Sequence, residues 1–112
     1  MMDRVADKFE HYMDLLSTRQ KLVTSNIANA DTPGYKTRDI DFQFEFQSQV
    51  ENSRPNVYEA PDLPSKNDGN NVNMDRELRL LSENALRFQL VATLARDEIR
   101  GIQSAIQEGK NG

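Results

Sequence analysis

Apolar residues recur at steps of four and three along the N-terminal part of the chain. They are Phe9, Met13, Leu16, Val23, Ile27 and Ala30, with the polar Gln20 at one position of the series. This spacing places them on one side of a helix and predicts an amphipathic helix over residues 3–30, about 40 Å long. Gln20 is interpreted either as a tolerated polar core residue or as a register-setting contact between subunits.

The C-terminal part of the chain, residues 75–112, predicts a second amphipathic helix over residues 75–108, with Gly109 as its stop. Its apolar stripe consists of Leu78, Leu81, Ala85, Phe88, Ala92, Ala95, Ile99, Ile102 and Ile106. Asn73 is the predicted N-cap, and Asp75 and Glu77 complement the helix dipole in the first turn. Leu86, Leu90, Val91 and Leu94 widen the stripe, which predicts contact with more than one neighbour.

The middle segment has a different composition. Residues 51–73 hold Pro55, Pro61 and Pro64 among several Asn and Asp, which predicts an irregular connector. Residues 37–50 are ambiguous, because Phe42, Phe44 and Phe46 alternate as in a strand while the wider spacing favours a short helix, which we prefer.

We therefore expect one small all-α domain in three parts: residues 1–36 (N-terminal helix and turn), 37–74 (middle segment) and 75–112 (C-terminal helix). The two terminal helices are expected to pack as an antiparallel, coiled-coil-like hairpin.

A tight turn is predicted where the first helix ends. Pro33 has the fixed φ required at the second position of a turn, and Gly34 permits the positive φ of the third position of a type II turn. Thr32 precedes a proline and is therefore disfavoured in the helical region. The helix should end near Ala30.

Two segments carry a family resemblance. The string from Ser25 to Lys36, Ser-Asn-Ile-Ala-Asn-Ala-Asp-Thr-Pro-Gly-Tyr-Lys, resembles the N-terminal signature of the bacterial flagellar rod and hook proteins. The string from Asp68 to Glu77, Asp-Gly-Asn-Asn-Val-Asn-Met-Asp-Arg-Glu, resembles the segment that opens the C-terminal helix in proteins of the proximal rod. The chain is thus similar to the flagellar basal-body rod protein family over residues 3–46 and 68–108.

The resemblance implies a structural subunit that polymerises through its terminal helices into part of a torque-transmitting drive shaft. It also implies partners, namely other rod subunits, further copies of the chain, and basal-ring and export-gate components at the membrane. The implied location is the periplasmic rod of the flagellar basal body, reached through the type III export apparatus without a cleaved signal peptide. The middle segment is short for the family.

Subunit-interface residues follow from the resemblance and the two stripes. In the N-terminal helix and turn they are Phe9, Leu16, Val23, Asn26, Ile27, Asn29, Thr32, Pro33, Gly34 and Tyr35. In the C-terminal helix they are Leu78, Leu81, Phe88, Ala92, Ala95, Ile99 and Ile102. For Asn26, Asn29 and Tyr35 the alternative interpretation is local capping within the chain.

Phe42 and Phe46 have two interpretations. Their spacing of four resembles an apolar element recognised by flagellar export gates in early substrates, and ordinary core packing explains the same residues. The single charges on the polar helix faces are interpreted as solvated.

Composition limits the other functions. A net charge of −4 does not suit nucleic-acid binding, and the absence of cysteine excludes disulfides and thiolate metal sites. His11 is the one histidine and the glycines are isolated, so we expect no cofactor, no metal and no enzymatic activity. No apolar run predicts a membrane span. The alternative function is a soluble helical adaptor or export chaperone that binds one client through its apolar stripe.

Overall fold

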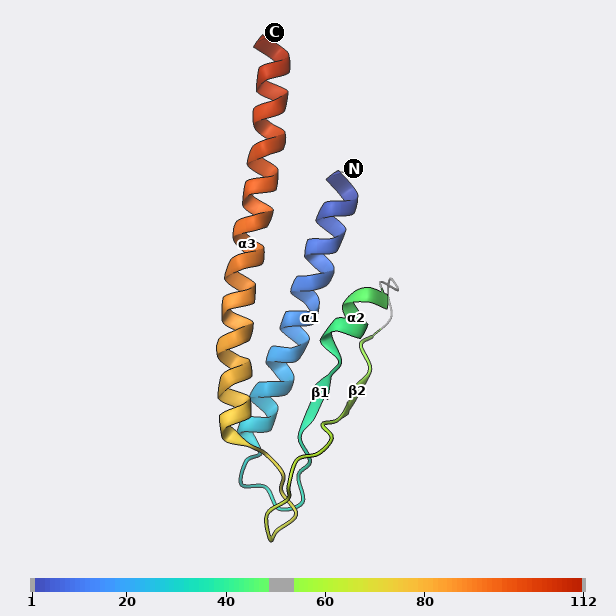
Figure 1. Ribbon diagram of the computed structural model, residues 1–112, viewed down its shortest axis with the longest axis vertical. Coiled ribbons are helices and arrows are strands. Elements are labelled where there is room, and N and C mark those ends of the chain that lie inside the picture. Colours follow the sequence, from blue (N-terminus) through green and yellow to red (C-terminus); the bar gives the residue numbers. More distant parts are fainter. Residues whose placement is uncertain (1, 49–53, 112) are drawn as a thin grey trace.

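The computed structural model describes residues 2–48 and 54–111 as an elongated molecule of 71 × 25 × 18 Å. The elements in order are α1 (Met2–Ala28), β1 (Arg38–Ile40), α2 (Phe42–Ser48), β2 (Val57–Glu59) and α3 (Met74–Asn111). Helices α1 and α3 run antiparallel, so that both termini lie at one end and the connecting loops at the other (Figure 1). The predicted antiparallel pair of long helices is therefore present.

Helix α1 ends two residues before the predicted Ala30. The amide of Asn29 still bonds the carbonyls of Ser25 and Asn26, at 3.1 and 3.2 Å, and tight turns follow as far as Tyr35. Thr32 cannot continue the helix because Pro33 follows it.

Helix α3 begins as predicted but continues beyond its predicted stop. The side chain of Asn73 accepts a hydrogen bond from the amide of Arg76 at 3.1 Å, as an N-cap does. Gly109 is helical, and the helix extends to Asn111. The predicted stop at Gly109 was wrong, since one glycine costs only about 1 kcal/mol in a helix and no proline follows it.

The middle segment contains more regular structure than predicted. The short helix α2 is confirmed, with Asp41 as its N-cap, because the Asp41 side chain accepts a hydrogen bond from the amide of Phe44 at 3.1 Å. However, β1 and β2 form an antiparallel pair with Arg38 opposite Glu59 and Ile40 opposite Val57. The all-α assignment is thus corrected to a mostly helical fold with a small two-stranded sheet in the described residues, and the predicted irregular connector contains the short strand β2. A three-residue strand is too short to give an alternation signal.

Helix α1 lies between two neighbours, with α3 on one side and the α2–sheet unit on the other (Figure 1). Its buried Leu15 and Leu16 pack with Ile40 and Phe42, and partly buried side chains surround this cluster. Leu15 is not among the apolar residues predicted for one side of this helix, because α1 is buried by neighbours on two sides.

The side of α3 that faces α1 differs from the predicted stripe. Glu77, Asn84 and Val91 are buried, whereas Leu78, Phe88 and Ile99 remain about half exposed. Asn84 donates to the carbonyl oxygen of Leu16 at 3.2 Å and to the side chain of Gln20 at 3.4 Å. Hydrogen-bonded polar side chains therefore lie where α3 contacts α1. Gln20 has its partner, Asn84, within the same chain.

Candidate functional site

The predicted turn is present at the end of α1. The amide of Tyr35 bonds the carbonyl of Thr32 at 3.2 Å, and Gly34 has a φ of 76°. A positive φ at the third position identifies a type II turn, which requires glycine or asparagine there.

The second segment of the family resemblance packs directly on this turn. The amide of Gly34 bonds the carbonyl of Asp68 at 2.9 Å, and the buried Asn70 donates to the carbonyls of Asn29 and Thr32, both at 2.8 Å. Gly69 has a φ of 85°, and a Cβ there would lie 3.4 Å from the Cα of Gly34. We call residues 29–37 together with 65–73 the motif junction.

Two lysines and an asparagine add further bonds across the motif junction. Lys36 donates to the Ser65 hydroxyl at 2.8 Å and to the carbonyl of Gly69, and Lys66 donates to the carbonyl of Ala30 at 3.1 Å. The Asn71 side chain accepts a bond from the amide of Thr37 at 2.6 Å. The two segments are therefore halves of one hydrogen-bonded unit that sets where α3 begins relative to the end of α1.

Asn26 connects this unit to both long helices. Its amide donates to the carbonyl of Arg38 at 2.9 Å and to Glu77 at 3.2 Å, and its oxygen accepts from the Arg38 amide at 3.1 Å and the Tyr35 hydroxyl at 2.9 Å. These bonds use both donors and both acceptor positions of the side chain. In this conformation Asn26 has no capacity left for a neighbouring chain.

Asn29 and Tyr35 also have local partners. Asn29 donates to the carbonyl of Ser25 at 2.8 Å and accepts from the Thr32 hydroxyl at 3.0 Å. The Tyr35 hydroxyl lies 3.3 Å from that of Ser25. These contacts give Asn29 a capping role at the end of α1, whereas Asn26 and Tyr35 bond other partners within the chain. The role of the three residues between subunits stays a prediction.

A charged network joins α1, β1 and α3 beside Asn26. Arg19 makes two bonds to Asp39, at 3.1 and 3.0 Å, and Arg76 bonds both Asp39 and Glu77, the latter at 2.7 Å. The carboxylates are almost fully buried and the arginines are less than one-fifth exposed. Two positive and two negative side chains balance, so no net charge is buried.

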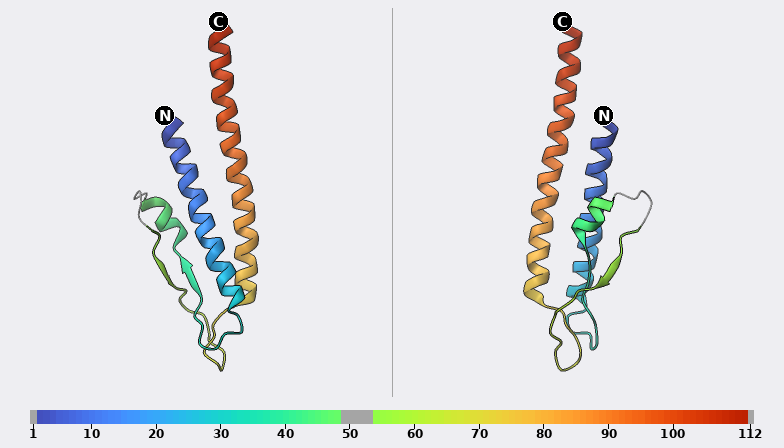
Figure 2. Two further views of the ribbon diagram at one scale, coloured as in Figure 1. Left: turned by 180° about the vertical axis from the view of Figure 1, so that it is seen from behind. Right: turned by 45° about the vertical axis from the view of Figure 1, so that its right-hand side comes forward.

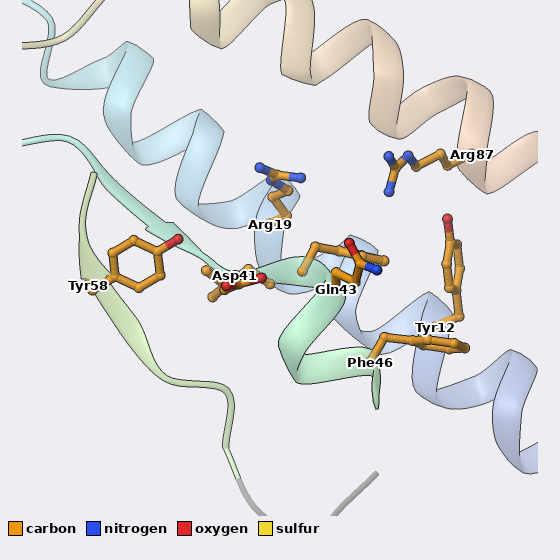
Figure 3. A pocket seen from close by; sticks show the side chains of 9 residues that line it. Tyr12, Arg19, Asp41, Gln43, Phe46, Tyr58 and Arg87 are labelled. Atoms are coloured by element: carbon orange, nitrogen blue, oxygen red, sulfur yellow. The ribbon is translucent and has the colours of Figure 1, made fainter. Parts of the chain in front are cut away.

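Phe42 and Phe46 pack in the core beside a pocket of about 610 Å³ (Figure 3). Tyr12 meets both rings edge-on, with centroid distances of 5.0 and 5.3 Å, and the Arg87 guanidinium lies 5.2 Å from the centroid of Phe42. These contacts explain both residues as packing residues, and a role in export stays a prediction.

The predicted interface residues fall into two groups. Leu16, Val23 and Asn26 are buried within the chain. The others are exposed or half-buried, namely Phe9, Ile27, Asn29, Thr32, Pro33, Gly34 and Tyr35, and Leu78, Leu81, Phe88, Ala92, Ala95, Ile99 and Ile102. Only the second group can contact another subunit without a change in this fold.

Several apolar residues of α3 that lie away from the motif junction are exposed to solvent. On α3, Leu86, Phe88, Leu90, Leu94, Ile99 and Ile106 are between 46% and 67% exposed. Among the described side chains, α1 has no buried residue before Leu15 and α3 has none after Val91. The free ends of both helices thus carry apolar side chains that the chain itself does not bury. We call the part of α1 before Leu15 and the part of α3 after Val91 the distal ends.

Sequence reasoning missed the pairing roles of Arg19, Asp39, Asn70, Asn71 and Arg76, and it assigned Glu77 only to the helix dipole. The available signal was the set of polar residues beside the turn and at the start of α3, several of them inside the quoted motifs. In the described part of the chain, every buried side-chain nitrogen or oxygen has a hydrogen-bond partner. That part also contains no group of three or more potential metal ligands, and none of its helices is long and apolar enough to cross a membrane.

Comparison with known proteins agrees with the two motifs. The model of a family described as flagella basal body rod protein matches residues 13–36, the part of α1 and the turn that enters the motif junction. Flagellar basal body rod protein FlgB of Yersinia ruckeri is 34% identical, and the match covers 87% of this chain and 89% of the relative. The chain belongs to the FlgB family.

Other FlgB proteins give similar matches. FlgB of Salmonella typhimurium is 33% identical over 97% of this chain and 99% of its own length, and FlgB of Escherichia coli strain K12 is 32% identical over 87% and 88%. The Salmonella match extends over 138 positions, whereas this chain has 112 residues. This FlgB-family chain is therefore shorter than that relative.

Proposed function

We propose that the chain is a structural subunit of the bacterial flagellar basal-body rod that polymerises through its terminal helices and forms part of the torque-transmitting shaft. The uncovered apolar side chains at the distal ends carry this proposal. Family membership supports a structural role and not an enzymatic one, and it does not favour the soluble adaptor.

The energetics suit repeated contacts. Full burial of a Leu, Ile or Phe side chain contributes about 1.5–3 kcal/mol, so covering the exposed half of one such residue on α3 contributes about 1 kcal/mol. Association costs several kcal/mol in lost motional freedom. Several such residues must therefore be covered together, which a packed helical assembly does and a single small contact does not.

Partners and location follow from the same proposal. Other rod subunits and further copies of the chain would cover the distal ends, and basal-ring and export-gate components would lie at the membrane end. The rod would be periplasmic, and the chain would reach it without a cleaved signal peptide.

The proposal is tested by placing charge on the distal end of α3. The double substitution Ile99→Glu and Ile106→Glu should leave the motif junction folded, because both residues are far from it, but should prevent incorporation into isolated basal bodies. Immunoblotting of basal bodies measures incorporation, and circular dichroism checks the fold. The pair Thr93→Glu and Gln107→Glu, two exposed positions on the polar side of α3, is the matched control and should be incorporated normally.

Two results would contradict the proposal. One is normal incorporation of the Ile99→Glu, Ile106→Glu chain. The other is a wild-type chain that is absent from basal bodies and instead forms a defined small complex with one client, as an adaptor does.

A further inference from the structure

The apolar cluster and helix α3 belong to separate parts of the molecule. The buried residues of the cluster are Leu15, Leu16, Ile40 and Phe42, and the partly buried side chains packed against them also come from α1 and α2. Helix α3 adds no residue to this cluster, and Val91 is its one buried apolar side chain among the described residues. Separation of α3 would therefore leave the contacts within the cluster intact.

Polar side chains hold α3 against α1. Glu77 and Asn84 are seven residues apart, about two helical turns, and so lie on one side of α3. Glu77 accepts a hydrogen bond from the side chain of Asn26 at 3.2 Å, and Asn84 donates one to the carbonyl of Leu16 at 3.2 Å. Water can replace these hydrogen bonds when the helices separate, so each one makes only a small net contribution to stability.

Two arginines on a second side of α3 contact the unit formed by β1, α2 and β2. Arg76 and Arg87 are eleven residues apart, about three helical turns, and so lie on the same side. Arg76 bonds Asp39 on β1, and the Arg87 guanidinium lies 5.2 Å from the ring centroid of Phe42 on α2. These contacts are also polar or charged on the α3 side. We call the four α3 residues the polar latch, namely Arg76, Glu77, Asn84 and Arg87.

Solvent reaches the polar latch at the pocket of about 610 Å³. Arg87 lines this pocket from α3, and Tyr12 and Arg19 line it from α1 (Figure 3). The side chain of Arg87 is 37% exposed. Water in the pocket can therefore hydrate this guanidinium group as soon as its contact with Phe42 breaks.

We propose that α3 separates from the rest of the chain as one unit while the apolar cluster stays folded, and that the polar latch sets how often this opening occurs. Separation of α3 exposes mainly groups that water solvates, whereas separation of α2 and the sheet from α1 exposes Leu15, Ile40 and Phe42. Local opening begins where the fewest apolar contacts are lost. The fold thus contains a conformational device by which α3 can leave its position on α1 without unfolding of the remainder.

Amide hydrogen exchange of the purified chain, at denaturant concentrations below the unfolding transition, tests this device. Residues 15–23 and 77–91 are both packed, and denaturant distinguishes their opening reactions. The amides of residues 77–91 should share one opening reaction and exchange about tenfold faster than those of residues 15–23, after correction for their intrinsic rates. A single opening reaction shared by both segments would overturn the inference.

Substitutions in the polar latch test its role. Arg76→Met and Arg87→Met each remove one guanidinium group and keep most of the length of the side chain. Each should speed exchange of residues 77–91 by about three- to tenfold, because a contact with a charged group is lost, and should leave residues 15–23 unchanged. Arg79→Met, at an exposed position of α3, is the matched control and should change neither segment. Equal acceleration of both segments by the latch variants would overturn the inference.

The latch and the rod-subunit function fail in different ways. The exchange measurement uses the monomer, and the wild-type comparison does not depend on how well the variants fold. A shared opening reaction overturns the latch and leaves the rod-subunit function standing. A wild-type chain absent from basal bodies overturns the rod-subunit function and leaves the latch standing.

Discussion

Buried asparagines join segments of this chain that are far apart in sequence. Asn26 and Asn70 are both fully buried, and each bonds backbone groups of another segment. Alanine would remove those partners and leave buried polar groups unpaired, at about 1–3 kcal/mol per group. An aspartate would keep the shape of the side chain but lose its two N–H donors.

Asn70→Ala should lower the free energy of unfolding by about 2 kcal/mol, because it leaves the buried amide of Val72 without its acceptor and removes one of the two hydrogen bonds that each of the Asn29 and Thr32 carbonyls accepts. Denaturant unfolding measures the change. Asn67→Ala, an exposed asparagine in the same loop, is the control and should change stability by less than about 0.5 kcal/mol. Equal effects of the two substitutions would show that Asn70 does not hold the motif junction together.

At the scale of elements, α3 combines two different kinds of segment. Its first half packs on α1 through Glu77, Asn84 and Val91, which fixes its register against that helix. Its second half holds Gly101 and the exposed isoleucines, and intrachain contacts do little to stabilise it. Helix propensity therefore matters more in the second half than in the first.

Gly101→Ala should raise the helical content of the isolated chain, because alanine is favoured over glycine by about 1 kcal/mol in a helix interior and its Cβ meets open space. Circular dichroism measures this gain. The same substitution should weaken incorporation into basal bodies if a neighbouring backbone approaches Gly101. Gln107→Ala, at an exposed position on the polar side of the same half of α3, is the control and should leave incorporation unchanged.

At the scale of the whole molecule, burial is concentrated near the loops. The loops of the motif junction lie at one end, and the two long helices separate toward their free ends (Figure 2). The apolar cluster around Leu15 packs against the middle of α1. Local stability follows the density of buried contacts and protected hydrogen bonds. The molecule thus combines a well-packed base with two weakly supported helix ends.

Amide hydrogen exchange on the monomer should show this gradient. We expect strong protection in residues 15–28 and 77–91 and nearly unprotected exchange in residues 4–11 and 99–109. Protection of these distal residues should rise in the assembled state, as neighbours cover them. Firm protection at the distal ends of a stable monomer would instead indicate a self-contained hairpin and would favour the adaptor.

The sequence by itself determined the features that depend on interactions between residues close together in the chain. The steps of three and four residues predicted both long helices, Pro33 and Gly34 predicted the type II turn, Asn73 predicted the start of α3, and the two motifs identified the family. Only the tertiary structure decided which polar residues pair across the fold, that β2 forms beside β1, and which side of α3 faces α1. Periodicity shows which side of a helix is apolar but not which element packs against that side. The polar side chains of Asn26, Asp39 and Glu77 can be buried only because segments distant in the chain supply their hydrogen bonds.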